Sequence, residues 1–332
     1  MFDDALLDEE AALARADATL RELAEAGARV RVDARSATEH QGAAPQDLSP
    51  RAVVAVGAEA RLLRAVLEPV SPVPFVAWDR PSLPAWASSL DLVVVTSSGD
   101  AASRAAVAEA QRRGCMLLVA AAPHSALAED AAGRWTTLLP VVTADPLAAC
   151  VAVLQALHAA GLAPSTDAEG VAGCLDAVAI ACSPFRDLGS NRAKQVADAV
   201  GDAQPLLWGG SVLAARAARR WAEGLRRVAG LPTFAGPATD LVPLLESAGP
   251  RDVFADPVDG EASARPRLVV LDDGSDDPRV RAERGGLAGA AERHDVGVDT
   301  VAAHDGDALG RYAALVATGG FVAAYVAVGL GL

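Results

Sequence analysis

Apolar residues recur at helical spacing near the start of the chain, separated by acids and arginines. Leucines and alanines at positions 6, 7, 11, 13, 14, 20, 23 and 24 follow this period. The pattern predicts a first helix that ends near Gly27, since a glycine readily closes a last helical turn. The stretch from there to Pro50 is polar and predicts a loop or a short connection.

Uninterrupted apolar runs follow and alternate with helical patterns. The runs occupy residues 52–56, 75–77, 90–95 and 116–121, and helical spacing occupies residues 58–67 and 101–113. Strands that are apolar throughout are typical of a parallel sheet covered by helices on both faces. We expect residues 92–95 to lie centrally in this sheet.

The second half of the chain repeats this plan. A helix at 146–160 and a polar connector at 164–167 precede helices at 192–200, 212–228, 280–293 and 309–328, with strands at 206–208 and 268–271 and an edge strand at 298–302. The predicted fold class is α/β, with two tandem subdomains that are each a parallel sheet flanked by helices. The predicted boundaries are 1–50 for an N-terminal helix and connector, 51–163 for the first subdomain and 164–332 for the second.

Charge limits the classes of partner. The chain has 43 acids and 29 bases, a formal net charge of −14, and Lys194 is its one lysine. Nucleic-acid binding needs clustered lysine and arginine, so we expect no nucleic-acid partner. The acidic start lacks the features of a signal peptide, and no apolar stretch approaches the roughly 20 residues that span a bilayer. We therefore expect a cytoplasmic protein without a membrane partner.

Motifs for cofactors and metals are missing from the sequence. The four cysteines form no CxxC pair and predict reduced, mostly buried thiols. Gly57 is followed by Ala58 and Glu59, which breaks a dinucleotide fingerprint, and there is neither a Walker loop nor a G-x-S-x-G elbow. The acids at 272, 273, 276 and 277 have no histidine near them in the sequence and are read as solvated turn residues. We expect no cofactor and no metal.

Small hydroxyl-bearing turns follow two of the predicted strands. Thr96, Ser97, Ser98 and Ser103 cluster after the first, and Ser211 follows two glycines after the second. Ligands of parallel sheets bind beyond the carboxyl ends of the strands, where helix N-termini attract anions. These turns therefore indicate a phosphorylated small molecule as ligand, with ordinary turn and N-cap residues as the alternative interpretation.

The segment LDLVVVTSSGDAASRAAVAE at residues 90–109 resembles the sugar isomerase (SIS) domain, whose phosphate loop follows a buried strand. Further segments resemble, in the same order, landmarks of the bifunctional phosphoglucose/phosphomannose isomerase family. They are FVAWDRPSLPAW at 75–86, NRAK at 191–194, WGGS at 208–211, RWAEGL at 220–225, PTF at 232–234, DPRVR at 277–281 and GFVAAYVA at 320–327.

This resemblance implies two SIS-like subdomains, a homodimer, and isomerisation of glucose or mannose 6-phosphate to fructose 6-phosphate. It indicates that Thr96, Ser97, Ser98 and Gly99 form the phosphate loop, to which the turn pattern adds Ser211. The base of the reaction would be Glu246, one residue from the position of the family's glutamate.

Several positions depart from the family's pattern. Glu59 stands where a phosphate-binding serine is expected, Leu147 replaces an arginine, Leu245 replaces the base, and the chain ends at Leu332, before the helix that carries the family's lysine. Isomerisation through an enediol needs a base and an oxyanion stabiliser, and the sequence shows too little of this equipment at the family's positions. The function is therefore predicted to be that of a sugar-phosphate isomerase family member, with two alternatives: a non-catalytic phosphosugar-sensing or partner-binding protein, or an interaction module without sugar-phosphate affinity.

Overall fold

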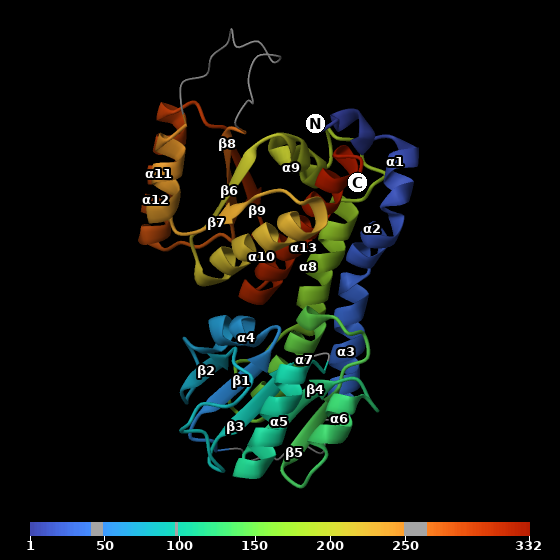
Figure 1. Ribbon diagram of the computed structural model, residues 1–332, viewed down its shortest axis with the longest axis vertical. Helices are drawn as coiled ribbons and strands as arrows, with labels where there is room; N and C mark the ends of the chain where they lie inside the picture. Colours follow the sequence, from blue (N-terminus) through green and yellow to red (C-terminus); the bar gives the residue numbers. More distant parts are fainter. Residues whose placement is uncertain (41–48, 97–98, 249–263) are drawn as a thin grey trace. The chain divides into compact units, whose positions relative to one another are not determined.

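The computed structural model describes residues 1–40, 49–96, 99–248 and 264–332 (Figure 1). It divides into two compact units. One unit is formed by Ala26–Gly173, and the other joins Met1–Glu25 to Cys174–Leu332. The predicted N-terminal segment 1–50 is thus shared between the two units, which are described separately below.

The unit Ala26–Gly173 is built on a parallel sheet of five strands in the order β2-β1-β3-β4-β5. β3 is the central strand, as predicted. The elements are α3 (Ala26–His40), β1 (Val53–Gly57), α4 (Ala60–Leu67), β2 (Phe75–Trp78), β3 (Leu92–Thr96), α5 (Ala101–Arg113), β4 (Met116–Ala121), α6 (Ala126–Ala131), β5 (Thr136–Pro140), α7 (Pro146–Ala159) and the start of α8 (Ala168–Ala181).

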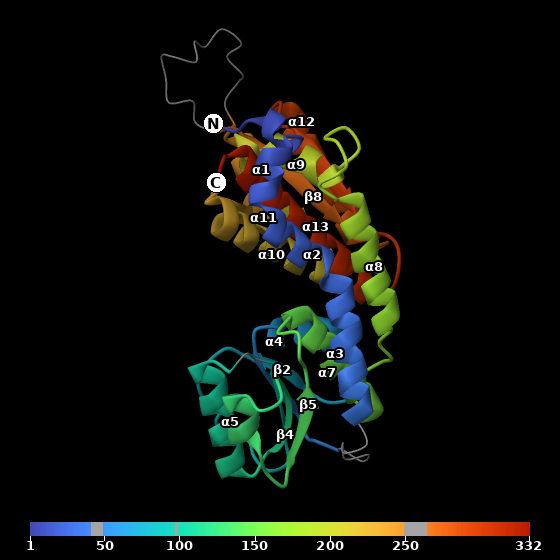
Figure 2. The same ribbon diagram turned by 90° about the vertical axis from the view of Figure 1, so that its right-hand side faces the viewer.

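Helices cover both faces of this sheet, with α5 on one side and α3 and α7 on the other (Figure 2). Side chains from alternate strand positions, such as Val93 and Val95 of β3, form a fully buried core with α5 and α6. The opposite face packs against α7, of which Cys150 and Val151 are fully buried. Burial on both faces explains why these strands are apolar throughout.

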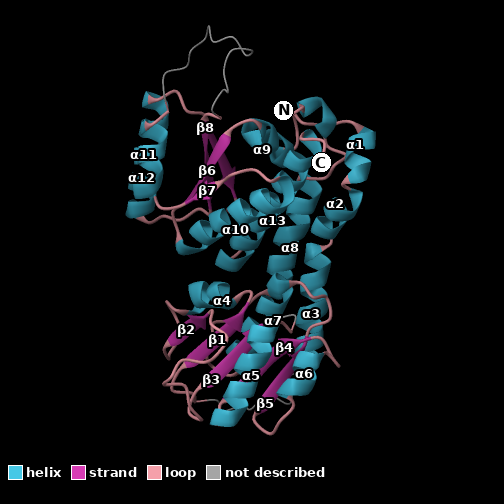
Figure 3. Ribbon diagram, viewed as in Figure 1, coloured by secondary structure: helices cyan, strands magenta, loops and turns pink. Residues whose placement is uncertain are grey.

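The second unit is built on a parallel sheet of four strands in the order β7-β6-β8-β9. Figure 3 shows strands of this sheet in magenta among cyan helices. β9 is an edge strand, as predicted. The elements are η1 (Asp4–Leu7), α1 (Glu10–Arg15), α2 (Asp17–Ala24), the rest of α8, α9 (Arg192–Gly201), β6 (Gln204–Gly209), α10 (Val212–Ala229), β7 (Phe234–Ala235), α11 (Ala238–Glu246), β8 (Pro266–Asp272), α12 (Pro278–Arg293), β9 (Val298–Ala302) and α13 (Ala308–Gly329). The two-sheet α/β class predicted from the sequence is confirmed.

Two predictions for the start of the chain are wrong. The first helix is broken into η1, α1 and α2, and Gly27 lies inside α3 instead of ending a helix. The polar stretch after it is helical to His40, because Val30, Asp33 and Ala37 are buried where α3 packs against α7. Tertiary packing overrides a pattern that is too polar to indicate a helix by itself.

α13 corrects the expectation that no apolar stretch approaches membrane-spanning length. It has 22 residues and is apolar enough to span a bilayer, but 72% of its most apolar window is buried inside the unit. Trp221 of α10 donates its indole N–H to the carbonyl of Leu315 at 2.6 Å, and a side chain at Gly319 would collide with that ring. α13 is therefore the core helix of this unit.

All four cysteines are free thiols, as predicted, and three are buried.

The N-terminal segment is held to its unit by a buried ammonium. Lys194 is 1% exposed, and its Nζ donates to Asp8 Oδ1 at 2.8 Å and to the carbonyl of Pro184 at 3.0 Å. Its charge also lies over the ring of Tyr325, 5.5 Å from the centroid. The hydrogen bond from Lys194 lowers the pKa of Asp8 below its ordinary value of 3.8, against the opposing effect of burial.

We predict that Asp8→Ala lowers the free energy of unfolding by about 1–3 kcal/mol, because Lys194 loses its anionic partner. A carboxylate with a lowered folded-state pKa contributes stability above the unfolded-state pKa and loses it as the pH falls through the folded value. The difference between variant and wild type should therefore shrink below pH 3.8. Urea denaturation over a pH series measures this. Asp17→Ala, which breaks an exposed pair with Arg21, is the control and should have little effect.

Candidate phosphosugar site

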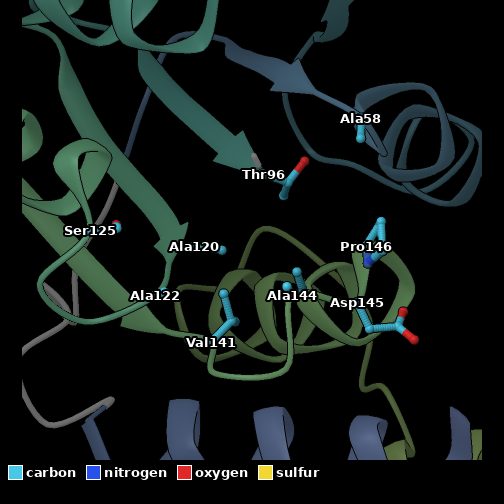
Figure 4. A pocket seen from close by; sticks show the side chains of 10 residues that line it. Ala58, Thr96, Ala120, Ala122, Ser125, Val141, Ala144, Asp145 and Pro146 are labelled. Atoms are coloured by element: carbon cyan, nitrogen blue, oxygen red, sulfur yellow. The ribbon is translucent and has the colours of Figure 1, made fainter. Parts of the chain in front are cut away.

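A pocket of about 200 Å³ opens at the carboxyl ends of β1, β3, β4 and β5 (Figure 4). Its described lining residues are Ala58, Thr96, Ala120, Ala122, Ser125, Val141, Ala144, Asp145, Pro146 and Ala149. Small apolar side chains make up most of the wall, and the polar side chains are those of Thr96, Ser125 and Asp145. The pocket lies where ligands of parallel sheets are expected to bind.

A close approach between β1 and β3 forms the floor of the pocket. Gly57 has φ +108°, and a Cβ added there would lie 1.9 Å from the carbonyl oxygen of Thr96. The same oxygen accepts a hydrogen bond from the N–H of Ala58 at 3.1 Å. Only glycine fits at position 57, and the turn that follows places Ala58 in the wall.

Thr96 lines the pocket at the end of β3 (Figure 4). Thr96 is 3% exposed, and its hydroxyl oxygen has no hydrogen-bond partner in the described structure. A buried hydroxyl without a partner costs free energy. A polar ligand in the pocket would satisfy it.

One wall of the pocket is fixed by a buried carboxylate from α3. Asp33 is fully buried and accepts hydrogen bonds from the N–H groups of Val142 and Thr143, at 2.7 and 3.2 Å, and from the Thr143 hydroxyl at 2.6 Å. The next residue, Ala144, has φ +54°, a left-handed conformation that is costly for alanine. Asp33 thus holds a strained loop that lines the pocket.

The N-terminus of α7, which borders the pocket, is capped by the carboxylate of Asp145. Asp145 Oδ1 accepts from the N–H groups of Leu147 and Ala148, at 2.9 and 3.2 Å, and so caps α7. Asp145 Oδ2 accepts from Arg29 of α3 at 2.8 Å. The α7 N-terminus that could bind a phosphate is therefore occupied by a carboxylate of the chain itself.

The predicted phosphate loop is described in part. Thr96 lines the pocket, whereas Ser97 and Ser98 lie outside the described residues. Gly99 has φ +94°, and Asp100 then caps α5 by accepting from the N–H groups of Ala102 and Ser103 at 3.0 Å. Glu59, which stands where the family pattern has a serine, is 3% exposed at the start of α4, directly after the lining residue Ala58.

The other predicted residues belong to the second unit. Ser211 caps α10 by accepting from the N–H of Ala214 at 3.0 Å, and its hydroxyl donates to Asp273. Glu246 is the exposed last residue of α11, 3.8 Å from Arg293. Because α11 starts just after the carboxyl end of β7, its nine residues carry Glu246 about 13 Å along the helix, away from the strand ends. The structure thus does not bring Glu246 and Ser211 together.

The residues expected to replace catalytic groups have structural roles. Leu245 is fully buried in the core between α11, α12 and the sheet. Leu147 is partly buried in the first turn of α7. Among the described lining residues, Asp145 is the one titratable side chain. In the part of the chain that the structure describes, no cluster of histidine, cysteine or acidic residues is suited to a metal ion.

Sequence reasoning missed the residues that build the pocket wall. Asp33 is 109 residues away from Val142, and its segment reads as a polar loop, so no local pattern indicates its role. Asp145 before Pro146 is a readable helix start, and Ser125 likewise caps α6 by accepting from the N–H of Ala128. These capping signals could have indicated that both loops reach the carboxyl edge of the sheet.

Comparisons with known proteins agree with this architecture. Residues 189–332 match a family model described as the bacterial phospho-glucose isomerase C-terminal SIS domain. A comparison with curated protein sequences finds no match.

Solved structures similar to the whole chain have the same fold. The C-terminal domain of glucosamine-fructose-6-phosphate aminotransferase from Francisella tularensis has a TM-score of 0.67 at 12% identity, covering 94% of this chain and 96% of that one. Tagatose-6-phosphate ketose/aldose isomerase from Escherichia coli has a TM-score of 0.63 at 16% identity, covering 94% and 93%. A glucose-6-phosphate isomerase like protein from Thermus thermophilus has a TM-score of 0.54 at 17% identity, covering 95% and 94%.

We predict that Asp33→Ala lowers the free energy of unfolding by about 3 kcal/mol or more, because buried N–H groups lose a charged acceptor. Amide hydrogen exchange at Val142 and Thr143 should also accelerate, which locates the effect in the pocket wall. Asp79→Ala removes an exposed ion pair with Arg61 in the same unit and serves as control. Unchanged exchange in the Asp33 variant would contradict this account of the wall.

Proposed function

We propose that this chain, which carries a SIS domain of the bacterial phosphoglucose isomerase family at residues 189–332, binds a phosphorylated sugar in the pocket above Thr96. The observation that carries this proposal is that Thr96, a lining residue of the pocket, has a buried hydroxyl without a hydrogen-bond partner in the described structure. A phosphate or sugar oxygen would accept a hydrogen bond from this hydroxyl. The sugar-phosphate names of the structurally similar proteins support this class of ligand.

The pocket favours weak binding. Its described lining contains no arginine, lysine or histidine, and the carboxylate of Asp145 caps the adjacent helix where a phosphate would otherwise bind. An anion must then rely on hydroxyl and backbone donors, beside a carboxylate that repels it. We expect dissociation constants from high micromolar to millimolar for hexose 6-phosphates.

The chain is proposed to act mainly as a phosphosugar-binding protein, with little or no isomerase turnover. Proton transfer between C1 and C2 needs a free base beside the substrate. Asp145, the titratable residue of the described lining, is engaged by Arg29 and two helix N–H groups.

Hexose 6-phosphate isomerisation is the second candidate function, favoured by the family match, and Glu246 is its proposed base. We further propose a cytoplasmic homodimer that binds no nucleic acid.

We predict that Thr96→Val weakens glucose 6-phosphate binding about five- to tenfold, which corresponds to the loss of one hydrogen bond worth roughly 1 kcal/mol. Isothermal titration calorimetry at fixed salt measures the change. Thr137→Val makes the same substitution at a buried position of β5 outside the pocket lining and should leave affinity unchanged. Glu59→Ser should strengthen binding if the turn after β1 contacts the phosphate. Equal affinity for Thr96→Val and wild type would contradict the proposed site.

A coupled assay for fructose 6-phosphate tests catalysis. With glucose or mannose 6-phosphate as substrate, we predict turnover at or below detection for the folded wild-type protein. Loss of a base and of an oxyanion stabiliser together raises a barrier by about 4 kcal/mol or more. Turnover near ~1 s⁻¹, an ordinary enzyme rate, would establish the isomerase function instead. Abolition of that turnover by Glu246→Gln would then identify the base.

A further inference from the structure

A second polar cluster lies at the carboxyl edge of the sheet β7-β6-β8-β9. It contains Asp272 at the end of β8, Arg284 of α12, His304 after β9, and Arg311 in the first turns of α13. Each comes from a different element, and all four meet around the turn at Gly274. None of them belongs to the pocket above Thr96, which lies in the other unit.

Asp272 is the centre of this cluster and is neutralised within it. Arg284 donates two hydrogen bonds to its carboxylate, at 2.8 and 2.6 Å, the N–H of Gly274 donates a third at 3.0 Å, and His304 Nε2 lies 3.4 Å away. Burial acts to raise the pKa of Asp272, but the hydrogen bonds from Arg284 and Gly274 outweigh it, so the pKa is lowered. The carboxylate therefore stays ionised and matches the charge of Arg284. The sequence-based statement that no histidine lies near these acids is corrected by His304.

Arg311 adds a positive charge that forms no ion pair with the other residues of the cluster. Its Nε is buried without a hydrogen-bond partner, and its guanidinium has no ion pair or hydrogen bond among the residues that the structure describes. The side chain reaches the turn, since a Cβ built on Gly274 would lie 3.7 Å from Arg311 Nη1 and 3.2 Å from the ring of His304. The Nε of Arg284 is also buried without a partner. Two arginines thus present unsatisfied donors at one turn.

Three acids of the neighbouring turns accept local hydrogen bonds, whereas Asp276 and Asp305 of the same turns are exposed. Asp273 accepts from the hydroxyl of Ser211 and from the N–H of Ser275, Asp307 caps α13 by accepting from the N–H of Gly310, and Asp277 caps α12. His304 remains accessible, with 57% of its side chain exposed. The turn is therefore open to solvent at His304, beside the partly exposed Arg311.

We propose that Arg311, assisted by His304, binds the oxyanion group of a small metabolite at this turn. The planar guanidinium offers paired N–H donors that match the spacing of phosphate or carboxylate oxygens. The ligand class is a small oxyanion, either phosphate or carboxylate. The residues of this site and the lining of the sugar-phosphate pocket belong to different units.

Nitrogen-15 NMR of the arginine side chains tests this assignment. Titration of wild-type protein with inorganic phosphate, and separately with acetate, should shift the Nε–Hε resonance of Arg311, and the stronger response shows which oxyanion is preferred. Arg311→Met should weaken phosphate binding at this site at least about tenfold. Arg227→Met removes one charge from the exposed far end of α10 in the same unit and should leave binding unchanged.

The outcomes separate this site from the pocket. Thr96→Val should leave the Arg311 response intact, so a failure of the phosphosugar proposal does not affect it. If Arg311→Met does not fold, Arg311→Lys keeps the charge but lacks the planar fork, and it should bind more weakly than wild type. An Arg311 resonance that does not move with either oxyanion, or equal affinities for Arg311→Met and Arg227→Met, would overturn the proposal.

Discussion

One buried carboxylate, Asp33, determines the shape of the pocket. A fully buried charge is tolerated only when hydrogen bonds replace its hydration, and Asp33 obtains them from the loop between β5 and α7. That loop then carries Ala144 in a left-handed conformation and presents Asp145 to the first turn of α7. Arg29, one turn before Asp33 on α3, holds the other oxygen of Asp145. Helix α3 thus fixes both ends of the loop.

The carboxyl ends of the strands carry different polar groups in the two sheets. At the end of β3, the Thr96 hydroxyl has no partner among the described residues, and Thr96 lines a pocket. At the ends of β6 and β8, Ser211 donates to Asp273, and Asp272 is paired with Arg284. Most polar groups at this second edge satisfy one another, whereas the Nε atoms of Arg284 and Arg311 have no partner in the described structure. The same strand-end geometry therefore yields a mostly apolar pocket in one unit and a cluster of charged side chains in the other.

The regular part of the fold could be predicted from the sequence because its signals are local. The pattern over residues 101–113 predicts α5 with its observed bounds, since an aspartate caps its start and a glycine its end. β5 was missed because two threonines interrupt its apolar pattern, and α3 because its stability comes from packing. The candidate site was predictable only at Thr96, which ends an apolar strand. Its wall depends on Asp33, whose partners are more than 100 residues away and leave no pattern in one sequence. Glu246 lies one residue from the position of the family's glutamate, but it is the exposed last residue of α11. Proximity to a motif in the sequence therefore does not establish that a side chain reaches a substrate.

The division of the chain into units bears on its synthesis. Residues 1–25 pack with residues 174–332, so the Phe2 ring meets Gly201 and Gly329, and Asp8 meets Lys194 only after 186 further residues are made. The unit 26–173 can fold as soon as it leaves the ribosome, whereas residues 1–25 find their partners only after that unit has been made. During that interval Leu7 and Leu20 are uncovered. The acids at positions 3, 4, 8, 9 and 10 give this segment a negative charge that opposes its aggregation.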